Sequence, residues 1–213
     1  MERKKVSKSV LRRLPSYLGY LKSLDEESHV HISATALANA LGMGEVQVRK
    51  DLAMVSDGGR PKIGYLREAL IEDIEHFLGY NNTNDAVLIG AGKLGQALLD
   101  YQGFEEFGLN ILAAFDVAPK MEITEGGKHV YPISCLEDYC RENRVLMGII
   151  TVPGDQAQQV ADRLIGCGIK AIWTFAHQLL EVPPHILVQY ENMATSLAVL
   201  SMHLQDQIRE EKK

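Results

Sequence analysis

A glycine-rich segment in the middle of the chain has the spacing GxGxxG, formed by Gly90, Ala91, Gly92, Lys93, Leu94 and Gly95. In such a segment the first glycine permits a tight turn, the second lets the backbone approach a pyrophosphate, and the third allows a helix to pack closely on a strand. An apolar run of strand length, 86–89, precedes the segment, and a helical pattern follows it from 93 to about 101. This context, more than the glycines alone, predicts a dinucleotide whose phosphates lie at a helix N-terminus.

An acidic residue follows at the distance that such a site requires. Asp116 closes the next predicted strand, 111–115, and lies 21 positions beyond Gly95. A carboxylate there accepts hydrogen bonds from the adenosine ribose hydroxyls and repels a 2′-phosphate. Asp116, with Val117 beside it, therefore favours NAD(H) over NADP(H). The alternative is that the glycines only shape a turn and that Asp116 is a surface residue.

Two further predicted strands end in residues that fit the same ligand. Open α/β sheets bind ligands at the carboxyl ends of their strands, where the strands 146–152 and 171–175 end. We expect residues there, and Tyr101, to border the nicotinamide, although core packing explains Phe175 equally well. The predicted cofactor-binding residues are Gly90, Ala91, Gly92, Lys93, Leu94, Gly95, Tyr101, Asp116, Val117, Thr151, Val152, Pro153 and Phe175; no metal site and no catalytic residue is predicted.

A second set of residues, nearer the N-terminus, is typical of DNA recognition. A tight turn at 42–44 separates two predicted helices, 34–41 and 45–55, and a Gly-rich tip at 57–62 predicts a hairpin. This arrangement is a winged helix-turn-helix, whose second helix enters the major groove. Val48, Leu52 and Val55 form the inner stripe of that helix, which leaves Gln47, Arg49, Lys50 and Met54 largely outward. The predicted DNA-binding residues are Gln47 and Arg49 for base edges, Lys50 for phosphate, and Arg60 and Lys62 at the wing tip; Met54 is also expected outward. The alternative is a solvated helix face and an ordinary charged turn.

The elements that position these residues change character at 79–84. Before this boundary the apolar period is helical, with a first helix that Pro15 is expected to start late, near Leu14, and a fourth helix at 66–78. After it, apolar strands at 86–89, 111–115, 146–152, 171–175 and 186–190 alternate with helices at 93–101, 136–142, 155–167 and 193–211. This alternation predicts an α/β fold with a parallel sheet covered on both faces.

Composition and charge narrow the class of protein. Residues 1–65 carry 11 Lys and Arg against 7 Asp and Glu, a net charge of +4, within a chain of net charge −6. A basic head on an acidic body suggests that only the head meets a polyanion. No apolar run is long enough for a membrane span, and 7–13 is too polar for a signal-peptide core, so a cytoplasmic protein is expected. Cys135 and Cys140 lie on different helix faces and are interpreted as packing residues.

The N-terminal and C-terminal parts of the chain both resemble one family, Rex, the bacterial redox-sensing transcriptional repressors. The resemblance rests on segments that run in family order along nearly the whole chain: 14–18, 47–52, 64–65, 87–95, 101–104, 114–116 and 151–153. It implies a winged-helix DNA-binding domain at 1–80, a Rossmann NAD(H)-binding domain at 81–191, and a C-terminal helix at 192–213 that is swapped between the subunits of a homodimer. It implies a repressor and no enzyme: the dimer holds palindromic operator DNA when NADH is scarce, NADH releases it, and NAD⁺ competes without release.

The chain departs from the family pattern at several places. Many members have Arg where this chain has Gln102, Asp-Leu where it has Asn192-Met193, and Phe-Ala-Pro where it has Phe175-Ala176-His177; the entry to the wing, 55–59, also differs. These differences affect the wing and the interdomain contacts and spare the dinucleotide site.

Two other classes of protein fit the same glycines. A small NAD-dependent oxidoreductase with a helical accessory domain would need an acid or base near the nicotinamide, and His177 is the one histidine placed at the carboxyl end of a strand. The other class is a regulator that binds CoA or another nucleotide.

Overall fold

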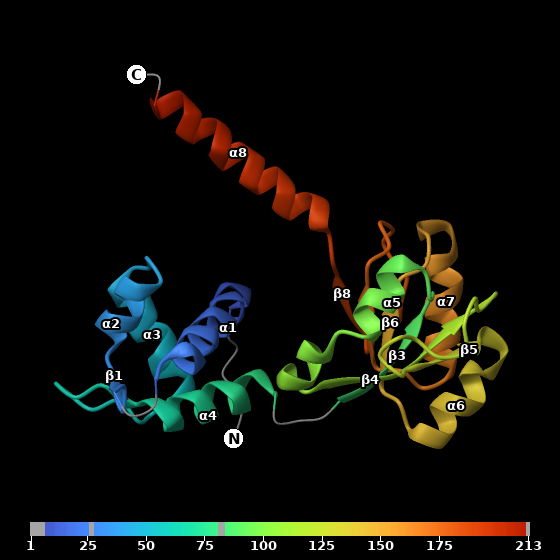
Figure 1. The fold of residues 1–213 in the computed structure, drawn as a ribbon, viewed down its shortest axis with the longest axis horizontal. Helices are drawn as coiled ribbons and strands as arrows, with labels where there is room; N and C mark the ends of the chain where they lie inside the picture. Colours follow the sequence, from blue (N-terminus) through green and yellow to red (C-terminus); the bar gives the residue numbers. More distant parts are fainter. Residues whose placement is uncertain (1–6, 26–27, 81–83, 212–213) are drawn as a thin grey trace. The chain divides into compact units, whose positions relative to one another are not determined.

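The structure is a computed structural model that describes residues 7–25, 28–80 and 84–211. The chain forms two compact units, Met1–Asn82 and Thr83–Lys213 (Figure 1). The predicted boundary, 79–84, includes residues 81–83, which lie outside the described residues.

The first unit begins with a helix that is longer than the sequence predicts. Helix α1 (Lys8–Ser23) starts where the Ser7 side chain accepts a hydrogen bond from the Val10 N–H, and Pro15 lies inside it. The expected late start is therefore wrong. A proline inside a helix costs about 3 kcal/mol. Here Pro15 lies on the exposed side, while Val10 and Leu14 are buried in the core of the unit, and that burial outweighs the lost hydrogen bond.

The remaining elements of the first unit form the predicted helix-turn-helix and wing. Helix α2 (Ala34–Ala40) is capped by Ser33 and joined by a tight turn at Gly42 to helix α3 (Glu45–Val55). Strand β1 (His31–Ile32) pairs antiparallel with β2 (Tyr65–Leu66), and helix α4 (Arg67–Leu78) follows. The wing lies between α3 and β2 and closes at an antiparallel bridge between Arg60 and Gly64, which places the hairpin slightly later than predicted.

Helix α3 buries more of its surface than the single apolar stripe that the sequence predicts. Val48 and Leu52 are fully buried, as predicted, and Asp51 between them is buried too. Met54, expected to point outward, is half-buried against the core, so that expectation is wrong. The face of α3 that remains for a ligand is therefore narrower and more polar than the sequence suggests.

In the part of the chain that the structure describes, six strands of the second unit form one parallel sheet, in the order β5-β4-β3-β6-β7-β8. The parallel sheet was predicted. The strands are β3 (Asn84–Ile89), β4 (Leu109–Asp116), β5 (His129–Pro132), β6 (Met147–Ile150), β7 (Ala171–Thr174) and β8 (Leu187–Tyr190). The sequence analysis missed β5, a short edge strand.

Helices and apolar side chains cover the two faces of this sheet unequally. On one face, α6 (Leu136–Asn143) and α7 (Gly154–Gly166) contribute to a core that includes Phe115 and Ile150. On the other, α5 (Lys93–Leu99) and a 3-10 helix, η1 (Gln102–Phe107), pack near Leu88 and Ile149. A second 3-10 helix, η2 (Ile133–Cys135), leads into α6. The sheet therefore has a large, continuous core on one face and a smaller one on the other.

The last helix, α8 (Met193–Glu211), begins where the Asn192 side chain accepts a hydrogen bond from the Thr195 N–H, 3.2 Å away. Asparagine and aspartate are about equally good at the N-cap of a helix, so Asn192 is suited to this position. Several apolar side chains of α8 are exposed, among them Leu197 (66%) and Leu200 (65%). No helix among residues 7–25, 28–80 and 84–211 is both long and apolar enough to span a membrane.

A buried thiol should make the sheet domain less stable as the pH rises through the alkaline range. Burial raises the pKa of Cys140 from 9.0 to about 12. A thiol whose pKa is raised on folding stabilises the folded state below its unfolded pKa, and this contribution is lost as pH rises toward the folded pKa. We expect the free energy of unfolding of the parent protein, relative to Cys140→Ala, to fall by about 1 kcal/mol between pH 8 and pH 10. Urea unfolding across this range would test it; parallel curves for the two proteins would contradict it.

Candidate functional site

The glycine-rich segment forms the turn between β3 and α5. Gly90 has φ of +102°, a left-handed conformation that favours glycine, and a Cβ there would lie 2.9 Å from Val152 Cγ1. Gly92 ends the turn, and α5 begins at the next residue. The sequence predicted this strand-turn-helix arrangement, because an apolar strand, three spaced glycines and a helical pattern follow one another directly.

The second and third glycines have different surroundings. A Cβ on Gly95 would lie 1.9 Å from the carbonyl oxygen of Gly90, so only glycine lets α5 pack this closely on the turn. A Cβ on Gly92 would meet no atom within 4 Å. Packing inside the protein therefore explains why position 95 is a glycine, but it gives no reason for a glycine at position 92. The open space at Gly92 is where a ligand could approach the backbone, as the GxGxxG spacing predicts.

Side chains from three elements hold the turn in place. The Asp116 carboxylate at the end of β4 accepts hydrogen bonds from the Ala91 N–H (2.7 Å) and the Ala118 N–H (2.9 Å). The Thr151 hydroxyl lies 2.7 Å from the Gly90 carbonyl oxygen, and the Gln96 amide donates to the Ala91 carbonyl oxygen at 2.7 Å. Because a carboxylate offers about four lone-pair positions, Asp116 can anchor the turn and still accept a hydrogen bond from a ligand.

A cavity of about 250 Å³ opens beside this turn at the carboxyl ends of β3, β4 and β6. It brings together many residues that the sequence singled out: Gly90, Gly92, Asp116, Val117, Thr151, Val152 and Pro153. Apolar side chains of η2 and α7, which the sequence analysis missed, complete the lining with Ile133 and Val160. The sequence pattern around Ile133 and Val160 did not indicate that they line a cavity, because the same pattern fits ordinary core packing. Lys93, Leu94 and Gly95 follow the turn in α5, whose N-terminus has no side-chain cap.

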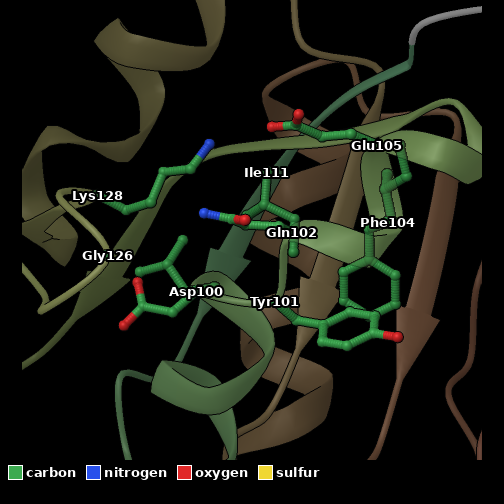
Figure 2. Close-up of a pocket in the computed structure, with 10 residues that line it drawn as sticks. Asp100, Tyr101, Gln102, Phe104, Glu105, Ile111, Gly126 and Lys128 are labelled. Atoms are coloured by element: carbon green, nitrogen blue, oxygen red, sulfur yellow. The ribbon is translucent and has the colours of Figure 1, made fainter.

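The structure does not bring Tyr101 or Phe175 into this cavity. Tyr101 follows the far end of α5, is 56% exposed, and lines a separate pocket of about 410 Å³. Figure 2 shows its ring beside that of Phe104 (4.8 Å between centroids), with the side chains of Lys128 and Gln102 extending into the pocket. Phe175 follows β7 and lies against Trp173, with ring centroids 4.8 Å apart. It packs on the smaller core, in agreement with the alternative that Phe175 is a core-packing residue.

The predicted DNA-binding side chains lie on the exposed surface of the first unit. Gln47, Arg49 and Lys50 are exposed on α3. A groove of about 450 Å³ joins Arg49 to the wing tip, where Arg60 and Lys62 also line it. Glu45 forms an ion pair with Arg49 one helical turn away. Three cationic side chains therefore border one concave surface, which suits a polyanion.

The backbone fixes the shape of the wing. Gly64 has φ of +90°, and a Cβ there would lie 2.3 Å from the Ile32 carbonyl oxygen, so the wing packs tightly against β1. Lys62 also has a positive φ, +68°, which is uncommon for a residue other than glycine. The wing therefore holds its two cationic side chains on a constrained loop.

The rival oxidoreductase would need an acid or base near the nicotinamide, for which the sequence offers His177. His177 is exposed in the loop after β7. Within the ranges that the structure describes, no three His, Cys, Asp or Glu side chains are grouped so as to hold a metal ion.

Comparisons with known proteins find matches for both units of the chain. Residues 5–53 match a family described as "Putative DNA-binding protein N-terminus", and residues 81–178 match one described as "CoA binding domain". A redox-sensing transcriptional repressor Rex from Treponema denticola is 41% identical over 197 residues, covering 90% of this chain and 92% of that protein. A Rex protein from Porphyromonas gingivalis is also 41% identical over 197 residues, covering 92% and 90%.

Solved structures of one relative match nearly the whole chain. A crystal structure of RSP in complex with β-NAD⁺ and operator DNA has a TM-score of 0.86 and 34% identity, covering 98% of this chain and 97% of that one. A structure of RSP with β-NADH has a TM-score of 0.85 and 33% identity, covering 99% and 100%. A winged helix joined to a dinucleotide-type sheet defines a class of ligand-responsive transcription regulators. The chain belongs to the Rex family of redox-sensing transcriptional repressors.

The second and third glycines of the segment, Gly92 and Gly95, should respond differently to the same substitution. Gly95→Ala forces its Cβ against the Gly90 carbonyl and should lower the free energy of unfolding by about 3 kcal/mol. Gly92→Ala, whose Cβ enters open space, should change it by no more than about 0.5 kcal/mol. Urea unfolding of both variants beside the parent gives the comparison. Equal losses would mean that the turn is not packed as described.

Proposed function

We propose that this protein is a transcriptional repressor that binds operator DNA through its N-terminal unit and NAD(H) through its sheet domain, and that NADH releases the DNA. The observation that carries the proposal is the cavity at the glycine turn, which combines Asp116 with an open backbone approach at Gly92. The same chain carries the cationic groove between α3 and the wing. RSP, solved with β-NAD⁺ and operator DNA and with β-NADH, supports this assignment. A repressor of this kind acts in the cytoplasm.

The dinucleotide lies with its pyrophosphate over the turn at Gly90 and Gly92. The adenosine end enters the cavity, with its ribose hydroxyls donating to the Asp116 carboxylate and its base beside Val117. The nicotinamide end extends toward the carboxyl ends of β6 and β7, which Thr151 and Phe175 directly follow. Asp116 excludes the 2′-phosphate of NADP(H), because two negative charges would meet in a partly buried site.

The active form is a homodimer in which α8 is exchanged between subunits. Two apolar surfaces in one chain support this. The first is the exposed apolar side of α8, which carries Leu197, Leu200 and Leu204. The second is an apolar groove of about 590 Å³ on the less covered face of the sheet, bordered by Trp173 and Leu187. Packing α8 of the partner on this face buries both, and a twofold dimer matches a palindromic operator.

The switch works through a difference in affinity between two states of this dimer. NADH must bind the DNA-free state more tightly than the DNA-bound state, so operator DNA must weaken NADH binding by the same factor. The two redox forms differ at one ring: oxidised nicotinamide is cationic and reduced nicotinamide is neutral. A site edged by Val152, Pro153 and Phe175 penalises burial of the unpaired cation, so the reduced form closes it more readily.

Operator binding measured against the NADH:NAD⁺ ratio tests the proposal. The duplex is first obtained by selection from a random library with the full-length protein. At fixed salt, NADH should lower the bound fraction, whereas NAD⁺ alone should not, and light scattering should give the mass of a dimer. Arg49→Ala should lose specific binding and keep its affinity for NADH, because Arg49 is the exposed base reader on α3.

Two outcomes would contradict this assignment. In the first, the parent protein stays on the duplex at saturating NADH. In the second, it consumes NADH with turnover, as the rival oxidoreductase would.

The Asp116 carboxylate sets the choice of dinucleotide. Asp116→Ala should lower NADH affinity by about tenfold to a hundredfold and raise the tolerance of NADPH, because it removes a charged acceptor from both the ribose and the turn. Asp116→Asn keeps an acceptor for the Ala91 N–H, so it should lose less NADH affinity and gain the same tolerance. Calorimetry with NADH, NADPH and CoA measures these affinities. If both variants kept the parent's preference for NADH over NADPH, the role of Asp116 in this choice would be refuted. Tighter binding of CoA than of NADH would favour the alternative of a CoA-binding regulator.

A further inference from the structure

A buried carboxylate joins α3 to α1. Asp51 is 3% exposed and accepts three hydrogen bonds: from Arg13 Nε (2.8 Å), from Arg13 Nη2 (2.9 Å) and from the Tyr17 hydroxyl (2.8 Å). Burying an ionised carboxylate is unfavourable unless it is paired and hydrogen-bonded, and here both conditions are met. The two parallel hydrogen bonds fix the plane of the Arg13 guanidinium relative to α3.

The same guanidinium also contacts Gln47, one helical turn before Asp51. With its amide oxygen turned toward Arg13, that oxygen lies 2.7 Å from Nη1 and 3.1 Å from both Nε and Nη2. Three such similar distances place the oxygen over the face of the planar guanidinium. The positive charge attracts the oxygen and repels the amide NH2 group. Arg13 therefore holds the oxygen of Gln47 inward and leaves its NH2 group as the part available to a ligand.

We propose that Arg13 is a positioning residue that sets which base Gln47 recognises; the inference rests on the proposed DNA-binding function. A free glutamine reads adenine by accepting from N6 and donating to N7. Gln47 has its acceptor turned toward Arg13 and offers donors alone. The base edge in the major groove that presents two acceptors side by side is guanine, through N7 and O6. Gln47 therefore selects guanine.

The test needs a variant that frees Gln47 and keeps α3 in place. Arg13→Met alone leaves the Asp51 charge buried and unpaired, which is strongly destabilising. Arg13→Met/Asp51→Asn removes both charges and keeps an acceptor for the Tyr17 hydroxyl. Arg12→Met is the control for the loss of a cationic side chain from α1, because Arg12 is the exposed neighbour of Arg13 on that helix. Gln47→Ala identifies the base pair that Gln47 contacts.

The experiment is selection of bound duplexes from a random library by the full-length parent and each variant, followed by sequencing. At the base pair whose preference disappears in Gln47→Ala, the parent should favour guanine over adenine by about tenfold or more. Arg13→Met/Asp51→Asn should lose this preference or reverse it to adenine, because its Gln47 presents both donor and acceptor. Arg12→Met should keep the parent's preference and show only weaker, salt-dependent binding.

The outcomes separate this inference from the proposed function. A parent that selects no defined sequence contradicts DNA recognition itself. A parent that selects a palindrome whose Gln47-dependent position is adenine overturns the role of Arg13, and so does a folded double variant that selects the same bases as the parent. Thermal unfolding of each variant establishes that it is folded before its selection is interpreted.

Discussion

The close contact between α5 and the turn that precedes it is the constraint on which the dinucleotide site depends. Because Gly95 has no Cβ, the first turn of α5 lies directly against the Gly90 carbonyl. That contact places the N-terminus of α5 at the carboxyl end of β3, whose neighbours in the sheet are β4 and β6. Thr151 from β6 and Asp116 from β4 then both reach the turn. The site is the meeting point of three strands and one helix, held by short hydrogen bonds.

A comparable constraint organises the first unit, but it is electrostatic. The ion pair between Arg13 and Asp51, together with the hydrogen bond from the Tyr17 hydroxyl, joins two helices that also pack through apolar, non-directional contacts. Hydrophobic packing alone would allow α3 to slide or rotate slightly on α1, whereas a bidentate pair with defined geometry restricts this motion. A helix that presents side chains to base edges needs such precision, because the hydrogen bonds that distinguish bases tolerate little displacement.

Patterns that are local in sequence predicted the turn, the parallel sheet and the exposed residues of α3. The missed features depend on contacts between distant segments. Strand β5 is short, ends in a proline and exists because β4 offers it an edge. The start of α1 depends on burial of Val10, which outweighs Pro15. The pairing of Arg13 with Asp51 spans 38 residues, and no spacing rule connects them. The sequence also predicts Tyr101 near the nicotinamide, whereas in the structure Tyr101 follows the C-terminal end of α5 and lines a pocket separate from the cavity at the glycine turn.

The exposed apolar side of α8 limits how such a repressor can be switched off. A lone chain with Leu197, Leu200 and Leu204 in water would present a surface prone to aggregation. Dissociation into single subunits is therefore an unsuitable way to release the DNA, because each round of release would expose the apolar side of α8 to water. In the homodimer proposed above, the two subunits therefore stay together through each cycle, and release from the duplex comes from a change in the spacing or angle of the two DNA-binding units.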